Sequence, residues 1–198
     1  MKIDLLSLTA HKIFGPMGIG ALYVGKKPRV RLEPIFSGGG QEKGLRSGTL
    51  APALCVGLGE ALRIADEEML GDAARLGALR DQMWQRLNGA VPGLVLNGSM
   101  TNRIGVNLNF SVDGADAESL MAALPGLAVS SGSACSSASD DSSHVLKAIG
   151  LSNALAEASL RIGLGRFTTA DEVESATKQI IKAITTVRDG RYEIAAAE

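Results

Sequence analysis

The sequence predicts an α/β protein in which short strands alternate with helices. Short apolar, β-prone runs are separated by segments whose apolar residues recur at helical spacing, and glycines mark the turns between them. This alternation favours a layered α/β unit over an all-helical bundle or an all-strand sandwich. No internal repeat is visible, and 198 residues are enough for one large or two small domains.

The N-terminal segment is expected to form a strand, a turn and a second strand. Residues 3–9 and 21–24 are short apolar, β-prone runs, and the glycines within 11–20 mark the turn between them. A second glycine-rich stretch, 37–49, is typical of a loop whose backbone passes close to a ligand or another chain.

One long helix is predicted next, from Pro52 to about Leu87, because apolar residues recur there at helical spacing and a proline stands at its start. After 91–93 the pattern changes to shorter elements. These are expected to be a strand at 104–112, a helix near 116–124, strands at 127–130 and 160–164, and a closing helix at 169–188.

Charge and hydropathy exclude two classes of partner. The chain has 20 basic and 21 acidic residues, a net charge of -1 and 45% hydrophobic residues, with no long run of either charge. A phosphate backbone or an anionic membrane surface attracts basic patches, which are missing here. The apolar run 1–9 is too short to span a membrane and lacks a small-residue cleavage site. We therefore expect no nucleic-acid partner, no membrane partner and no export.

The two cysteines have different surroundings, so a disulfide framework is not expected and a reducing cytoplasm is the natural setting. Cys55 lies among apolar residues at the start of the long helix, which is typical of a packed structural thiol. Cys135 lies in 130–143, a stretch of small polar residues that has little to bury and would present the thiol on a mobile arm. A plain serine-rich loop with an incidental cysteine fits the same residues.

Lys12 ends the first strand and leads into the glycine-rich turn. A desolvated lysine loses its proton more easily, and the free amine can form a Schiff base with a carbonyl or with pyridoxal phosphate. A surface lysine beside a turn is the alternative. The glycines at 15–18 do not form a nucleotide-binding P-loop, because the lysine precedes them instead of closing the motif.

Arg161 stands in an otherwise apolar strand and therefore needs an anionic partner. A substrate carboxylate is a good bidentate match, and an internal Asp or Glu would serve equally well. The two histidines, His11 and His144, are each typical of hydrogen-bonded structural residues, although His11 adjoins the candidate lysine. We expect no metal site.

Several motifs, in their order and spacing, resemble the pyridoxal-phosphate-dependent cysteine desulfurases of the NifS/IscS type over about 3–188. They are Thr-Ala-His-Lys at 9–12, Ile-Phe-Gly-Pro-Met-Gly-Ile-Gly-Ala-Leu-Tyr-Val at 13–24, Gly-Gly-Gly-Gln-Glu at 38–42, Arg-Ser-Gly-Thr at 46–49, Ser-Gly-Ser-Ala-Cys-Ser-Ser-Ala-Ser at 131–139 and Leu-Arg-Ile-Gly-Leu-Gly-Arg-Phe-Thr-Thr at 160–169. The long serine-rich cysteine loop is similar to that of the housekeeping and nitrogen-fixation group.

The resemblance implies a cofactor site and a homodimer. By position, Lys12 would hold pyridoxal 5'-phosphate as a Schiff base and move the substrate α-proton. Thr9 and His11 would hold the cofactor phosphate, and Thr49 would reach that phosphate from the opposite subunit.

The resemblance also implies a reaction. Arg161 would bind the carboxylate of L-cysteine, and Cys135 would attack the substrate sulfur to give a persulfide and L-alanine. The loop would then carry the sulfur to an acceptor, as in iron-sulfur cluster assembly.

The implied architecture is the remainder of a fold-type-I cofactor domain at 1–70 and a smaller C-terminal α/β domain at 71–198 that carries the cysteine loop. The family's N-terminal residues that stack on the pyridine ring and pair with its nitrogen have no counterpart here. We therefore expect a truncated product, a fragment or one half of a split enzyme whose other half is a separate chain. The short tail is not expected to dock an iron-sulfur scaffold protein.

Three functions follow from these observations. The chain is a cysteine desulfurase that needs its missing half, an inactive fragment that keeps the dimer and partner surfaces, or a thiol-based sulfur carrier in which Cys135 accepts persulfide without a cofactor.

Overall fold

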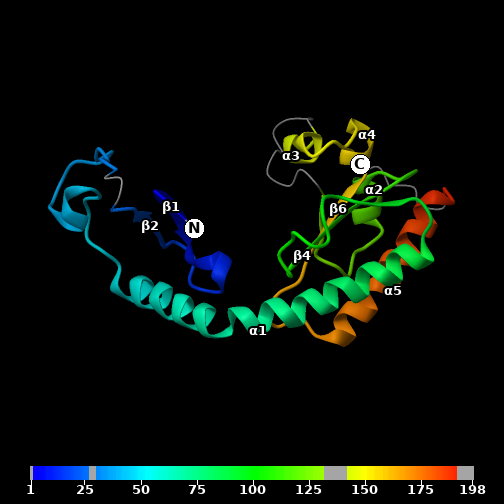
Figure 1. Ribbon diagram of the computed structural model, residues 1–198, viewed down its shortest axis with the longest axis horizontal. Helices are drawn as coiled ribbons and strands as arrows, with labels where there is room; N and C mark the ends of the chain where they lie inside the picture. Colours follow the sequence, from blue (N-terminus) through cyan, green and yellow to red (C-terminus); the bar gives the residue numbers. More distant parts are fainter. Residues whose placement is uncertain (1, 27–29, 132–141, 191–198) are drawn as a thin grey trace, which may run out of the picture. The chain divides into compact units, whose positions relative to one another are not determined.

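Strands and helices alternate along the chain, which confirms the α/β class (Figure 1). The computed structural model describes residues 2–26, 30–131 and 142–190. Its internal contacts divide the chain into two units, Met1–Met69 and Leu70–Glu198. The domain roles expected for 1–70 and 71–198 stay predictions.

The first unit begins with a two-stranded antiparallel sheet. β1 (Leu5–Thr9) pairs with β2 (Gly20–Val24), and the register places Thr9 opposite Gly20. A Cβ at Gly20 would lie 2.5 Å from the carbonyl oxygen of Leu8, so only glycine lets the strands approach this closely. The short helix η1 (Ala10–Ile13) follows β1 directly, and η2 (Gln41–Gly44) lies in the later glycine-rich loop.

The long helix α1 (Pro52–Ala90) has the start that the sequence predicts and ends three residues beyond the predicted Leu87. Its residues belong to both units, because the division falls after Met69. In the first unit, α1 buries Leu58 and Ala61.

The second unit is built on an antiparallel sheet with strand order β3-β4-β6-β5. The strands are β3 (Leu94–Leu96), β4 (Asn107–Val112), β5 (Ser130–Ser131) and β6 (Ser159–Gly163). In addition to the C-terminal part of α1, this unit contains the helices α2 (Ala117–Ala122), α3 (His144–Ala148), α4 (Asn153–Glu157) and α5 (Ala170–Arg188).

The core of this unit lies on one face of the sheet. Side chains alternate between the faces of a strand, so Leu108, Phe110 and Val112 of β4 share a face with Leu160 and Ile162 of β6. All five are buried in one apolar cluster with α1 and α5, whose buried members include Leu76, Met83, Leu87, Ile180 and Ile184. The other face of β4 and β6 carries polar side chains.

Several short elements differ from the prediction. β4 begins at Asn107 instead of 104, and the strand expected at 127–130 forms ladder bonds only at Ser130–Ser131, because Leu127 closes a turn on Leu124. β3, α3 and α4 were not predicted. Each has three to five residues, too few for a periodic apolar pattern.

No helix in the described part of the chain has both the length and the apolar character that crossing a membrane requires.

Candidate functional site

The first group of candidate residues lies where β1 ends. Thr9 is the last residue of the strand, and its Oγ1 lies 3.0 Å from Nδ1 of His11. The backbone N–H of Ala10 donates to the carbonyl of Ile19 at 3.0 Å, which ties the start of η1 to the neighbouring strand. The structure therefore brings the Thr9 hydroxyl and the His11 ring together, with Lys12 next in the same short helix.

A tight turn holds this group against the start of α1. η1 ends at Phe14, whose φ of 63° lies in the left-handed region. The next residue, Gly15, donates its N–H to the carbonyl of Ala10 at 2.8 Å, and a Cβ there would lie 3.0 Å from the Cβ atoms of Ala10 and Ala61. Close packing on both sides fixes the backbone that carries Lys12. The side chains of His11 and Lys12 remain exposed.

Thr49 lies apart from this group, in a polar pocket of about 490 Å³ formed by the glycine-rich loop. The buried Ser47 braces the pocket, because its Oγ donates to the carbonyl of Ser37 at 2.9 Å. Gln41 Oε1 accepts the N–H of Gly48 at 3.2 Å. Among the described hydrogen bonds, none joins Thr49 to Thr9, His11 or Lys12.

Arg161 lies on β6, on the polar face of the second unit's sheet. It is exposed, with Asn109 of β4 opposite it on one side and Ser130 of β5 on the other. Within the described parts of the chain, no Asp or Glu forms an ion pair with Arg161. The internal partner that the sequence allows is thus not found there, and the guanidinium faces solvent.

Sequence reasoning missed a buried polar cluster on the same face of the sheet as Arg161. Asn97, Ser111 and Ser159 are almost completely buried, and hydrogen bonds connect them: Asn97 Nδ2 donates to Ser159 Oγ at 3.0 Å, and the Ser111 and Ser159 hydroxyls lie 2.9 Å apart. The signal was the alternation of polar and apolar residues in 107–111, which places one polar side chain after another on the face opposite the core.

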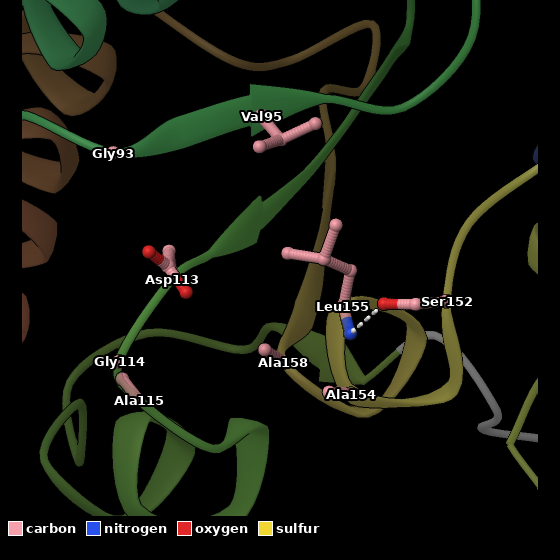
Figure 2. Close-up of a pocket in the computed structure, with 9 residues that line it drawn as sticks. All are labelled: Gly93, Val95, Asp113, Gly114, Ala115, Ser152, Ala154, Leu155 and Ala158. Atoms are coloured by element: carbon pink, nitrogen blue, oxygen red, sulfur yellow. Dashed lines mark hydrogen bonds between the residues drawn. The ribbon is translucent and has the colours of Figure 1, made fainter.

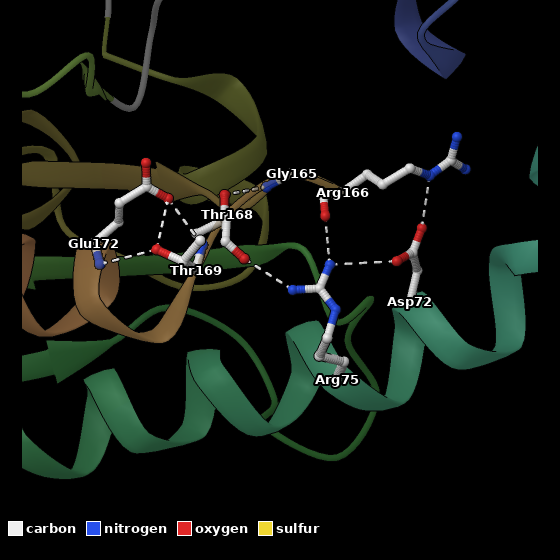
Figure 3. Close-up of polar contacts among 7 residues, drawn as sticks. All are labelled: Asp72, Arg75, Gly165, Arg166, Thr168, Thr169 and Glu172. Carbon is white, nitrogen blue, oxygen red and sulfur yellow. Dashed lines mark hydrogen bonds and ion pairs between the residues drawn. The ribbon is translucent and has the colours of Figure 1, made fainter.

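A second missed group holds the loop after β6 on α1 (Figure 3). Arg75 donates to the carbonyls of Thr168 and Arg166, at 2.8 and 2.5 Å. Arg166 Nε donates to Asp72 Oδ2 at 2.9 Å. This bond from Arg166, helped by Arg75, lowers the pKa of the Asp72 carboxyl, while partial burial acts in the opposite direction. We call Asp72, Arg75 and Arg166 the loop clamp.

The cysteines fall into two cases. Cys135 lies outside the described residues. Cys55 is a free thiol, half-buried in the first turn of α1, so it is less completely packed than its apolar neighbours led us to expect.

A separate pocket of about 480 Å³ lies between the β3 and β4 ends and α4 (Figure 2). Asp113 is the one charged residue that lines it, and Ser152 uses its Oγ to accept the N–H of Leu155 at 3.3 Å. None of the residues that the sequence singled out lines this pocket. Within the described residues there is also no group of three or more His, Cys, Asp or Glu that could hold a metal ion.

Comparisons with known proteins agree on one family. The aminotransferase class-V family matches residues 1–175. The chain is 52% identical over 189 residues to cysteine desulfurase IscS of Pseudomonas aeruginosa PAO1, covering 96% of this chain and 46% of that protein. It is 53% identical, with the same coverage, to cysteine desulfurase IscS of Tolumonas auensis.

Solved structures agree with the fold. A NifS-like protein matches with a TM-score of 0.80 at 30% identity, over 93% of this chain and 47% of that one. DndA from Streptomyces lividans matches with a TM-score of 0.63 at 33% identity, over 81% of this chain and 46% of that one. The chain thus has the mixed α/β fold of part of these proteins, and it spans about half the length of the curated relatives that it matches.

Proposed function

Because the chain belongs to the aminotransferase class-V family, we propose that it forms part of a pyridoxal-phosphate-dependent cysteine desulfurase. Such an enzyme converts L-cysteine to L-alanine and keeps the sulfur as a protein persulfide. The names of the relatives support the reaction, and the resemblance to a NifS-like structure supports the fold. The observation that carries the proposal is the hydrogen bond between Thr9 and His11, directly beside an exposed Lys12.

The residues at the end of β1 fit two parts of pyridoxal phosphate. A phosphate accepts hydrogen bonds from hydroxyl and imidazole donors, which Thr9 and His11 offer side by side. An aldehyde reacts with a free amine, and Lys12 has no carboxylate partner among the described residues. We assign Thr49, on its polar pocket, to the same phosphate in a second copy of the chain. No described residue is assigned to the pyridine nitrogen.

Each residue then has one task. When bound, pyridoxal phosphate withdraws electrons from the substrate α-carbon. The Lys12 amine takes the α-proton, and the Arg161 guanidinium binds the carboxylate through two parallel hydrogen bonds. Lys12 belongs to the first unit and Arg161 to the second.

We assign the sulfur transfer to Cys135. Its thiolate attacks the sulfur of the substrate, so an S–S bond forms while the Cβ–S bond breaks. The electron pair of the broken bond stays with the carbon, which takes a proton and leaves as alanine. The persulfide then passes its outer sulfur to an acceptor, in a reducing cytoplasm where thiols persist.

A second candidate function is a dimerising or partner-binding module. It is favoured by apolar side chains on both faces of the β1–β2 sheet: Leu5, Leu6, Leu22 and Tyr23 are each about half exposed. A sheet that is apolar on both faces is typical of α/β proteins in which other elements cover both faces. The covering chain would be a second copy of this chain or a separate partner chain.

Cofactor binding tests the proposal directly. Adding pyridoxal phosphate to the chain is expected to produce an absorbance band near the edge of the visible range, because the Lys12 amine forms a Schiff base with the aldehyde. The band should vanish in Lys12→Ala and persist in Lys26→Ala, a matched exposed lysine of the same unit. Equal bands in both variants would contradict the assignment. Persulfide on Cys135 from an external donor, without cofactor, would instead favour a sulfur carrier.

A further inference from the structure

A row of polar side chains crosses the second unit's sheet. Asn109 lies directly opposite Arg161, and Arg161 lies directly opposite Ser130. At the far side, the backbone N–H of Asn97 donates to the carbonyl of Asn109 at 3.0 Å, just beyond the end of β3. Residues directly opposite one another in antiparallel strands project from the same face with Cβ atoms about 5 Å apart. The polar row therefore places an amide and a hydroxyl on either side of the Arg161 guanidinium.

Buried hydrogen bonds set the orientation of the Asn109 amide. Asn97 is only 3% exposed, and its Nδ2 donates to Asn109 Oδ1 at 2.6 Å and to Ser159 Oγ at 3.0 Å. Its own Oδ1 accepts the Ser111 hydroxyl at 3.1 Å. The Ser159 hydroxyl donates its one proton to the carbonyl of Leu155 at 2.8 Å, so it can only accept from Asn97. Asn97 therefore presents Nδ2 on this side, and Asn109 accepts from it through Oδ1.

This arrangement leaves the amino group of Asn109 as an available donor. Among the described residues, no acceptor takes a hydrogen bond from Asn109 Nδ2, and no carboxylate pairs with Arg161. A carboxylate has two oxygens with about four lone-pair sites, so it can take a bidentate guanidinium and still accept another N–H. Unused donors next to an unpaired cation are the groups that such an anion needs.

We propose that Asn109 is a second donor to the carboxylate that Arg161 binds, and that Asn97 is the positioning residue that turns the Asn109 amino group toward it. The row holds a single positive charge, which fits a monoanionic carboxylate better than a phosphate dianion. The identification of that carboxylate as L-cysteine rests on the proposed function. The carboxylate class rests on the polar row alone.

A binding titration tests this on the chain itself, without cofactor. L-alanine is the probe, and L-alaninamide, which lacks the carboxylate, is the matched probe. NMR signals of the Asn109 side-chain amide and the Arg161 Nε–H report on the two donors. L-alanine is expected to shift both signals with one dissociation constant, and L-alaninamide neither. A shift at Arg161 without one at Asn109 would overturn the proposal. Because the titration uses the unmodified chain, its outcome does not depend on whether any variant folds.

Variants add a quantitative check. Asn109→Leu keeps the approximate volume and removes the donor, so affinity for L-alanine should fall about fivefold to tenfold. Asn109→Asp should lower it further, because a second anion would pair with Arg161. The control Asn102→Leu changes an exposed asparagine of a loop and should bind as the parent chain does. Unchanged affinity in Asn109→Leu would contradict the proposal. The Lys12 absorbance band reports separately on the proposed function, so either idea can fail alone.

Discussion

Reactivity at the residue scale depends on what surrounds each side chain. Lys12 and Arg161 are both exposed cations without an ion-pair partner among the described residues. Most surface cations look the same in a sequence, and what sets these two apart is position. Lys12 follows a strand whose turn is fixed by close packing around Gly15, and Arg161 lies between two polar neighbours on its sheet.

Thiol labelling separates the two cysteines. Only the thiolate reacts, so the rate depends on how readily each thiol ionises and on how exposed it is. Cys55 is half-buried, whereas Cys135 is flanked by small polar residues. Alkylation in native buffer is expected to mark Cys135 before Cys55, as followed by peptide mass spectrometry. The fast phase should disappear in Cys135→Ser and remain in Cys55→Ser. Faster modification of Cys55 would refute the assignment of Cys135 as the sulfur carrier.

At the element scale, polar contacts fix the position of segments that have few buried apolar side chains. The loop after β6 contains few buried side chains, and the loop clamp ties its backbone carbonyls to α1 instead. α5 then begins with a capping box, in which Thr169 and Glu172 exchange hydrogen bonds with each other's backbone N–H. The sequence predicts this helix from 169, and the structure places Thr169 at the N-cap and begins α5 at Ala170.

The loop clamp gives the stability a pH dependence. The hydrogen bond from Arg166 holds the pKa of Asp72 below its unfolded value of about 3.9. A depressed carboxyl pKa contributes stability above the unfolded pKa, and this contribution is lost as pH falls through the folded pKa. Asp72→Asn should therefore lower the unfolding temperature at neutral pH, and the difference from the parent chain should shrink in acid.

Asp66→Asn, at an exposed position of α1, is the control for this effect. Thermal melts followed by circular dichroism at several pH values provide the measurement. A gap between Asp72→Asn and the parent that stays constant as the pH falls would show that the clamp does not act through the carboxylate.

At the scale of the whole molecule, the exposed apolar side chains of β1 and β2 form a candidate association surface. Burying a leucine side chain contributes about 1.5–3 kcal/mol, so the β1–β2 sheet should promote association. We expect the mass in sedimentation to rise with concentration, and Leu22→Lys to weaken association by about tenfold or more. Thr185→Lys, on the exposed side of α5, adds the same charge and should have no such effect. A chain that stays monomeric at all concentrations would count against both the homodimer and the module.

The sequence was most informative where a pattern is long. It predicted the start of α1 at Pro52, the closing helix and the order of the longer strands, because apolar periodicity over many residues outweighs local exceptions. Short elements such as β3 and α4 escaped it, since a few residues carry no period. The motif residues Thr9 and His11 lie together as neighbours in sequence must, but the contribution of Asn97 depends on a strand pairing that no local pattern reveals.

The register of β6 also constrains how this protein can change over generations. Residues alternate between the apolar core and the polar row, so deleting one residue before Arg161 would turn Leu160 or Ile162 outward and push a guanidinium into the core. Insertions and deletions of single residues are therefore expected in the connecting loops. Within the strand, a single insertion or deletion would remove the proposed anion site and damage the core at the same time. Only an insertion or deletion of two residues would keep both the alternation of the side chains and the core.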